Sequence, residues 1–137
     1  MPGSWALNIP EKTNASYSIK KFLQMGQPMN LLFICSRNQW RSPTAEEIWR
    51  KHPEYNCRSA GTSPKAKRTV SPADIRWADA IFVMEKKHRN RLLAEFTRLL
   101  DHKPVYVLDI PDDYHYMDPE LIEELQDKVS SYLPNKQ

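Results

Sequence analysis

The chain has 137 residues, which fits one domain built around one hydrophobic core. Its 20 Lys and Arg residues against 17 Asp and Glu residues give a mild positive charge, which suits anionic ligands but falls well short of a nucleic-acid-binding protein. Two cysteines are too few for a disulfide framework, and no apolar run is long enough to span a membrane. We therefore expect a cytoplasmic protein whose partners are neither nucleic acid nor membrane.

The first strong structural signal is the apolar run of residues 31–35, which is typical of a strand buried on both faces. Residues 1–28 contain neither an uninterrupted apolar segment nor a small-residue cleavage site, so they do not resemble a secretory signal. Their Pro, Asn, Ser and Gln content predicts a loosely ordered extension, followed by one domain over residues 29–137. Met25 and Met29 both stay open as the start of that domain.

A helix is predicted to follow the first strand almost at once. Pro43 suits its first turn, Ala45, Ile48 and Trp49 share one face, and His52-Pro53 ends it.

The rest of the chain alternates strands with helices. Further strands are predicted over residues 55–60, 80–84 and 105–108. Helices are predicted from the Ser71-Pro72 start, over residues 86–100, and from the Asp118-Pro119 cap to Leu133. This alternation predicts an α/β fold, in which right-handed crossovers place helices on both faces of a parallel sheet. Ligands of such sheets bind beyond the carboxyl ends of the strands, where the loop of residues 35–42 lies.

This loop has a thiol at one end and a guanidinium at the other. Cys35 and Arg41 enclose five residues and Ser42 follows, which is a C-x5-R-S pattern. A loop of this size can turn its backbone N–H groups inward, and the next helix adds its positive N-terminal end, so together they can hold a phosphate dianion. Arg41 would hold two phosphate oxygens, while the same positive field would stabilise Cys35 as a thiolate nucleophile and Ser42 would donate to it.

Residues 32–46, which contain this pattern, resemble the phosphate loop and first helix of the low-molecular-weight protein tyrosine phosphatases. Ser59-Ala60-Gly61-Thr62 resembles the segment after their second strand, and residues 78–84 resemble their third strand. The likeness extends from residue 31 to about residue 133 and is closest to the compact, predicted-phosphatase branch. It implies a four-stranded parallel sheet with the phosphate loop after the first strand, no metal or other cofactor, and phosphomonoester hydrolysis through a phosphocysteine on Cys35.

The resemblance also implies which residues surround the substrate. Arg41 would bind the phosphate, and further substrate contacts would come from Ser36, Arg37, Asn38, Gln39, Trp40, Ser42, Asp113 and Tyr114. Arg37 stands where the family usually has Gly, and Trp40 where it often has a second Cys. We expect these two residues to influence the choice of substrate, whether a phosphotyrosine protein or a small phosphomonoester.

Hydrolysis of a phosphate ester also needs a general acid to protonate the leaving oxygen. Asp109, Asp112 and Asp113 all follow the fourth predicted strand and compete for this role. Family members carry the acid in a segment like Pro-Asp-Pro-Tyr, which is similar to Pro111-Asp112-Asp113-Tyr114. The resemblance therefore implies that Asp112 is the general acid.

Several alternatives stay open at this point. Cys57 is either a strand residue or a resolving thiol able to form a disulfide with Cys35. The four histidines have no i, i+4 or Cys-paired spacing, so no metal site is expected. Besides hydrolysis, the phosphate loop fits a phosphate-binding regulatory module without turnover, or an arsenate-reductase-like enzyme, which would need further thiols. The sequence does not decide the oligomeric state.

Overall fold

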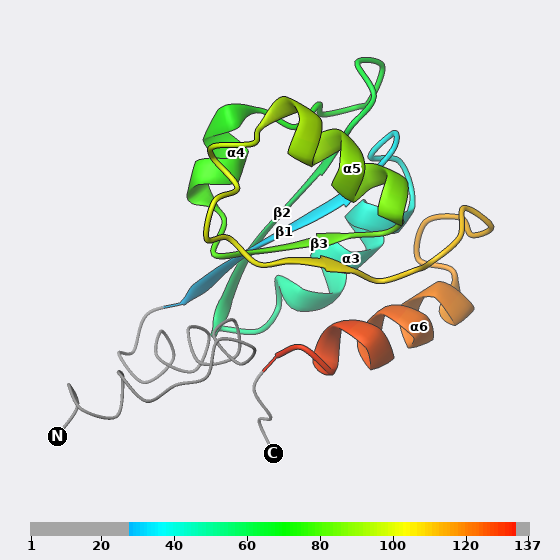
Figure 1. Ribbon diagram of the computed structural model, residues 1–137. Helices are drawn as coiled ribbons and strands as arrows, with labels where there is room; N and C mark the ends of the chain where they lie inside the picture. The colour runs from blue at the N-terminus through cyan, green and yellow to red at the C-terminus, as the bar shows by residue number, and fades with distance from the viewer. Residues whose placement is uncertain (1–27, 134–137) are drawn as a thin grey trace, which may run out of the picture.

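The computed structural model describes residues 28–133 as a four-stranded parallel sheet with helices on both faces (Figure 1). The strands are β1 (Met29–Cys35), β2 (Tyr55–Gly61), β3 (Ala80–Val83) and β4 (Val105–Val107), in the spatial order β2-β1-β3-β4. The helices are α3 (Arg41–Trp49), α4 (Pro72–Trp77), α5 (Lys86–Glu95) and α6 (Pro119–Ser130). The predicted fold class is confirmed.

The extension expected over residues 1–28 lies, apart from Pro28, outside the described residues, and so does Met25. Met29 is the first residue of β1, and its side chain is only 1% exposed. The strand therefore begins two residues before Leu31, where the apolar run was expected to start.

β1 lies inside the sheet, and its side chains enter two separate cores. The first core, which α3 and α6 cover, contains the side chains of Leu31, Phe33 and Cys35. The second core, which α4 and α5 cover, contains Leu32 and Ile34. Successive side chains of a strand point to opposite faces, so a strand covered on both faces has to be apolar throughout. This burial explains the uninterrupted apolar run.

The pairing register brings the carboxyl ends of three strands to one edge. Cys35 pairs with Gly61 at the end of β2, and Ile34 pairs with Val83 at the end of β3. β2 and β3 lie on opposite sides of β1, and the crossovers that lead to them pass over opposite faces of the sheet (Figure 1). The loop after Cys35 therefore opens at the point where the crossovers diverge, which is the expected ligand site of such a sheet.

Two helix ends show which local signals decided the fold. The predicted start of α4 is confirmed, because Ser71 and Asp74 form a reciprocal capping box ahead of the helix. The helix expected over residues 86–100 ends earlier, at Glu95, since the backbone of Phe96 leaves the helical region. Leu100, which follows in a turn, packs into the second core instead.

Candidate active site

Residues 35–41 form a loop that the neighbouring segment holds from outside. The carbonyl oxygens of Cys35, Ser36 and Arg37 accept hydrogen bonds from the backbone N–H groups of Thr62, Ser63 and Lys67, each at 3.0 Å. Because these carbonyls face the 62–67 segment, they point away from the inside of the loop. This is the arrangement that a phosphate-binding cup requires.

Gly61 makes this close packing possible. A Cβ atom on residue 61 would lie 2.5 Å from the carbonyl oxygen of Ser36 and 3.0 Å from the backbone nitrogen of Asn38. Any side chain would therefore push the loop out of place. Asn38 itself has a positive φ of 54°, which lets the loop turn tightly and which asparagine tolerates better than most residues.

The thiol of Cys35 lies at the base of the cup and is hydrogen-bonded to Ser42. Cys35 Sγ is 3.0 Å from Ser42 Oγ, and the Asn38 amide nitrogen donates to Ser42 Oγ at 3.0 Å and to Ser59 Oγ at 2.9 Å. Ser59 in turn donates to Glu46 Oε1 at 2.6 Å. Since the amide nitrogen can only donate, Ser42 accepts from it and has its own hydrogen left. Ser42 can donate that hydrogen to the sulfur, at 3.0 Å, or to the carbonyl oxygen of Ala60, at 3.5 Å.

Arg41 is fixed by two groups on different loops. Its Nη1 donates to Glu85 Oε2 at 2.6 Å and to the carbonyl oxygen of Ile110 at 2.8 Å, and the side chain is 2% exposed. Burial raises the pKa of Glu85, but the hydrogen bond and charge of Arg41 outweigh it and hold that pKa below its usual value. Glu85 is therefore ionised and anchors one nitrogen of the guanidinium. Nη1 is therefore held by Glu85 and Ile110, while Nε lies near the side chain of Asp112.

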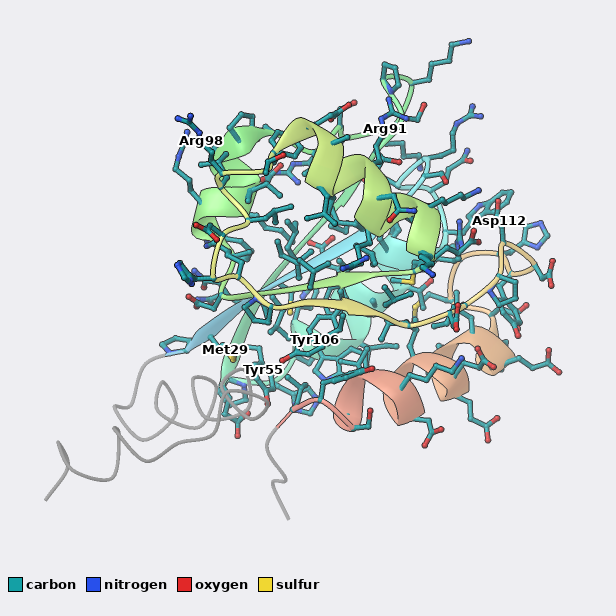
Figure 2. All side chains as sticks on the ribbon, viewed as in Figure 1. Met29, Tyr55, Arg91, Arg98, Tyr106 and Asp112 are labelled. Carbon is teal, nitrogen blue, oxygen red and sulfur yellow. The ribbon has the colours of Figure 1, made fainter. Side chains whose placement is uncertain are left out.

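Two of the three competing carboxylates, Asp112 and Asp109, border different hollows of the surface. Asp112 lines the same cavity as Cys35 and Arg41, and its Oδ1 is 3.7 Å from Arg41 Nε. Asp109 instead borders a groove beside Glu85 and Lys87. The Asp112 side chain is 59% exposed and stands on the loop after β4, at the end of the molecule opposite to Met29 (Figure 2). Of the three, Asp112 alone lines the cavity of the nucleophile.

Other residues expected around a substrate fall into two groups. Ser36, Arg37, Gln39 and Trp40 line the cavity, whereas Asn38 and Ser42 are buried behind it in the hydrogen-bond network described above.

The structure does not bring Asp113 or Tyr114 into the lining of this cavity. Tyr114 packs against the first core and borders a groove with acidic residues of α6, among them Glu120 and Glu124. The substrate contacts expected of Asp113 and Tyr114 stay predictions.

Three residues near the cavity were missed from the sequence. His115 contacts Trp40, with ring centroids 4.7 Å apart and ring planes tilted by 48°, while Glu85 anchors Arg41 and His88 hydrogen-bonds to Ser36. Glu85 follows β3 by two residues, and β3 is the direct neighbour of β1. Its place after a buried strand was a signal that could have found it. No comparable signal marks His115, which lies on an irregular loop.

Cys57 lies far from the nucleophile. It pairs with Leu31, four residues before Cys35 on β1. Four residues of strand span about 13 Å, whereas the Cα atoms of a disulfide lie within about 7 Å. Burial and the nearby charge of Glu46 raise the pKa of Cys57 to about 12, so its thiol stays protonated. Cys57 therefore behaves as a strand residue, and the resolving-thiol alternative does not fit the fold.

Two other kinds of site are absent from the described residues. Within residues 28–133, no three His, Cys, Asp or Glu side chains gather closely enough to hold a metal ion. The helices of that part of the chain are also too short and too polar to cross a bilayer.

No protein-family model and no curated protein matches the sequence. Solved structures do match the fold. The tyrosine phosphatase Wzb from Escherichia coli K30, solved with phosphate, superposes with a TM-score of 0.63 and 20% identity, over 77% of this chain and 96% of its own. The YwlE arginine phosphatase from Geobacillus stearothermophilus gives a TM-score of 0.58 and 18% identity, over 77% and 88% of the two chains.

A low-molecular-weight phosphotyrosine phosphatase from Vibrio cholerae O395 gives a TM-score of 0.57 and 22% identity, over 75% of this chain and 95% of its own. All three structures carry the same arrangement of strands and helices over most of their length. The chain therefore has the fold of the low-molecular-weight protein tyrosine phosphatases.

Proposed function

We propose that the chain hydrolyses phosphomonoesters in two steps, through a phosphocysteine on Cys35. The observation that carries this proposal is the 3.0 Å contact between Ser42 Oγ and Cys35 Sγ, beside the buried guanidinium of Arg41, because a thiolate at this position can only accept from the hydroxyl. A hydrogen bond donated to the sulfur stabilises the thiolate, which is the nucleophilic form. A YwlE variant solved with a phosphorylated active-site serine supports a phosphoenzyme intermediate on this fold.

In the first step, the Cys35 thiolate attacks phosphorus and the bond from phosphorus to the leaving oxygen breaks. Asp112 gives its proton to that oxygen, so an alcohol or phenol leaves. Nε and Nη2 of Arg41, together with the inward N–H groups of the loop, hold the three remaining phosphoryl oxygens and the negative charge that builds up on them.

In the second step, water attacks the phosphocysteine. Asp112, now ionised, takes a proton from the water as the sulfur–phosphorus bond breaks. Inorganic phosphate leaves, and both the thiolate and the protonated carboxyl are restored. Neither step uses a metal or an organic cofactor.

We propose that the preferred substrate is an aryl phosphate that carries further negative charge, such as a phosphotyrosine in an acidic segment. On one side of the cup, Arg37 lines the cavity and Lys65 and Lys67 are exposed on the 62–70 loop, which contains no acidic residue. Asp112 also lines the cavity, so its rim carries both a basic and an acidic side chain. The rings of Trp40 and His115, whose planes are tilted by 48° to each other, offer aromatic surface for an aromatic leaving group.

Turnover of 4-nitrophenyl phosphate tests the proposed activity. We expect the wild-type chain and Cys57→Ser to release phosphate at similar rates, and Cys35→Ser to be inactive with an unchanged thermal unfolding curve. Cys57→Ser is the matched control because it removes the other thiol. Binding of phosphate without turnover by the wild-type chain would instead support the regulatory-module alternative.

A further inference from the structure

His88 is a buried histidine that the two chemical steps above do not use. It is the third residue of α5 and is 1% exposed. Each ring nitrogen takes part in one hydrogen bond. Nδ1 lies 3.0 Å from the backbone nitrogen of Glu85, and Nε2 lies 2.8 Å from Ser36 Oγ. The ring therefore bridges the start of α5 and the residue that directly follows the nucleophile.

The two contacts fix the position of the proton on the ring. A backbone N–H can only donate, so Nδ1 has to be the unprotonated acceptor, and the neutral ring carries its hydrogen on Nε2. Burial and the positive charge of Arg41 lower the pKa of His88 to about 4, so the ring is neutral near pH 7. His88 consequently donates to the oxygen of Ser36.

The direction of that bond decides what the Ser36 hydroxyl can do. Because its oxygen accepts from His88, its own hydrogen remains to be donated elsewhere. Ser36 lines the cavity together with Cys35 and Arg41. Among residues 28–133, His88 is the hydrogen-bond partner that the structure gives to Ser36 Oγ. The hydroxyl hydrogen is therefore left for a ligand in the cup.

We infer that His88 is a positioning residue, which fixes the Ser36 hydroxyl as a donor to a non-bridging oxygen of the bound phosphoryl group. The neutral ring holds the hydroxyl oxygen in place and polarises its O–H bond without adding a charge to the cup. A hydrogen bond to a charged oxygen of this kind is worth about tenfold to a hundredfold in binding. The inference rests on the proposed function, because it assigns Ser36 and His88 to the same cup.

Two substitutions of His88 separate this role from helix capping. In His88→Asn, the amide atoms occupy the level of Nδ1, so the acceptor for the Glu85 N–H is kept and the donor to Ser36 is lost. In His88→Gln, the amide atoms extend to the level of Nε2, so the donor to Ser36 is kept and the capping acceptor is lost. Ser36→Ala removes the hydroxyl, and Ser36→Thr keeps it.

Binding of inorganic phosphate, measured by calorimetry, and kcat/KM for 4-nitrophenyl phosphate are the readouts. We expect Ser36→Ala and His88→Asn each to weaken both by about tenfold or more, and Ser36→Thr and His88→Gln to stay within about threefold of wild type. The double variant Ser36→Ala, His88→Asn should lose no more than Ser36→Ala alone, because both changes remove the same bond. Thermal unfolding of each variant shows whether it is folded.

The opposite order, with His88→Gln impaired and His88→Asn normal, would reduce His88 to a capping residue and overturn the inference. Additive losses in the double variant would overturn it as well. Failure of the proposed function would look different. The wild-type chain would then bind phosphate without turning over an ester, and the binding series would still decide the roles of His88 and Ser36.

Discussion

Replacement of Asp112 by Asn removes the proposed proton donor and keeps the size of the side chain. The effect should depend on the leaving group. A poor leaving group such as an alkoxide has to be protonated as it departs, and a general acid contributes about 10²–10⁴-fold to such a step. An activated phenolate such as 4-nitrophenolate departs without a proton. We therefore expect a loss of about 10²-fold or more in kcat/KM for alkyl phosphates and a much smaller loss for 4-nitrophenyl phosphate.

The structure limits what else the substitution can do. Asp112 Oδ1 lies 3.7 Å from Arg41 Nε, which corresponds to an attraction of about 4.5 kcal/mol at an effective dielectric constant of about 20, or about 1 kcal/mol in water. The Asp112 side chain is 59% exposed, so the lower figure applies. A change of about 1 kcal/mol alters a rate about fivefold. A loss of about 10²-fold therefore requires the missing proton transfer.

The assay compares kcat/KM across a series of aryl and alkyl phosphates that differ in leaving-group pKa. A plot of log kcat/KM against that pKa should be steeper for Asp112→Asn than for the wild-type chain. Asp113→Asn is the matched control, because it removes the neighbouring charge and does not line the cavity. Parallel plots for Asp112→Asn and wild type would refute the assignment. A steeper plot for Asp113→Asn would move the role to that residue.

Four further predictions concern residues around the cup and in the core. Arg41→Lys should lose most activity on 4-nitrophenyl phosphate although it keeps the positive charge. Glu85 and the Ile110 carbonyl hold one nitrogen of Arg41, and lysine has no further nitrogen to bind phosphate. Near-normal initial rates in this variant would place Arg41 outside the site. Arg37→Gly should reduce kcat/KM for acidic phosphotyrosine peptides more than for 4-nitrophenyl phosphate. The control variant Arg98→Gly, at a position far from Asp112 in Figure 2, should change neither value. An equal loss on every substrate would contradict the proposed role of Arg37 in binding acidic substrates. Mass spectrometry of the peroxide-treated chain should find sulfinic or sulfonic acid on Cys35 and no Cys35–Cys57 disulfide, because Cys57 pairs with Leu31 toward the other end of β1. Detection of that disulfide would mean that β1 and β2 separate. Burial raises the pKa of Asp74, but hydrogen bonds from Arg68 and Ser71 outweigh it and hold that pKa below its ordinary value of 3.8, so the ionised carboxylate stabilises the fold above pH 3.8 and this stabilisation is lost as the pH falls further. Asp74→Asn should therefore lower the free energy of unfolding in urea by about 1–2 kcal/mol at pH 7 and by less near pH 3. The same loss of stability at both pH values would contradict the assignment.

The parts of this fold that sequence reasoning could predict are those that local chemistry decides. The apolar run before Cys35 shows a strand covered on both faces, and the Ser71 to Asp74 spacing shows the start of α4. The two ends of the phosphate loop can be recognised in the sequence, because the proposed chemistry needs a thiol at one end and a guanidinium at the other.

Contacts between distant segments could not be predicted in the same way. Glu85 reaches Arg41 across 44 residues of sequence, and His88 reaches Ser36 across 52. Both contacts depend on β3 lying beside β1. The amino-acid sequence does not show which strands are neighbours in the sheet. The side on which Tyr114 packs depends likewise on where α6 docks. The end of α5 at Glu95 was missed because Leu100 also fits helical spacing, although it reaches the second core from a turn.

The most direct test of the account is to look for the phosphocysteine itself. The wild-type chain is mixed with 4-nitrophenyl phosphate, quenched in acid during turnover, digested and analysed by mass spectrometry. We expect one added phosphoryl group on the peptide that contains Cys35, at higher occupancy in Asp112→Asn, where attack by water on the intermediate is slowed. Turnover with the phosphoryl group on a different residue, or with Cys35 unmodified in both proteins, would contradict the proposed mechanism.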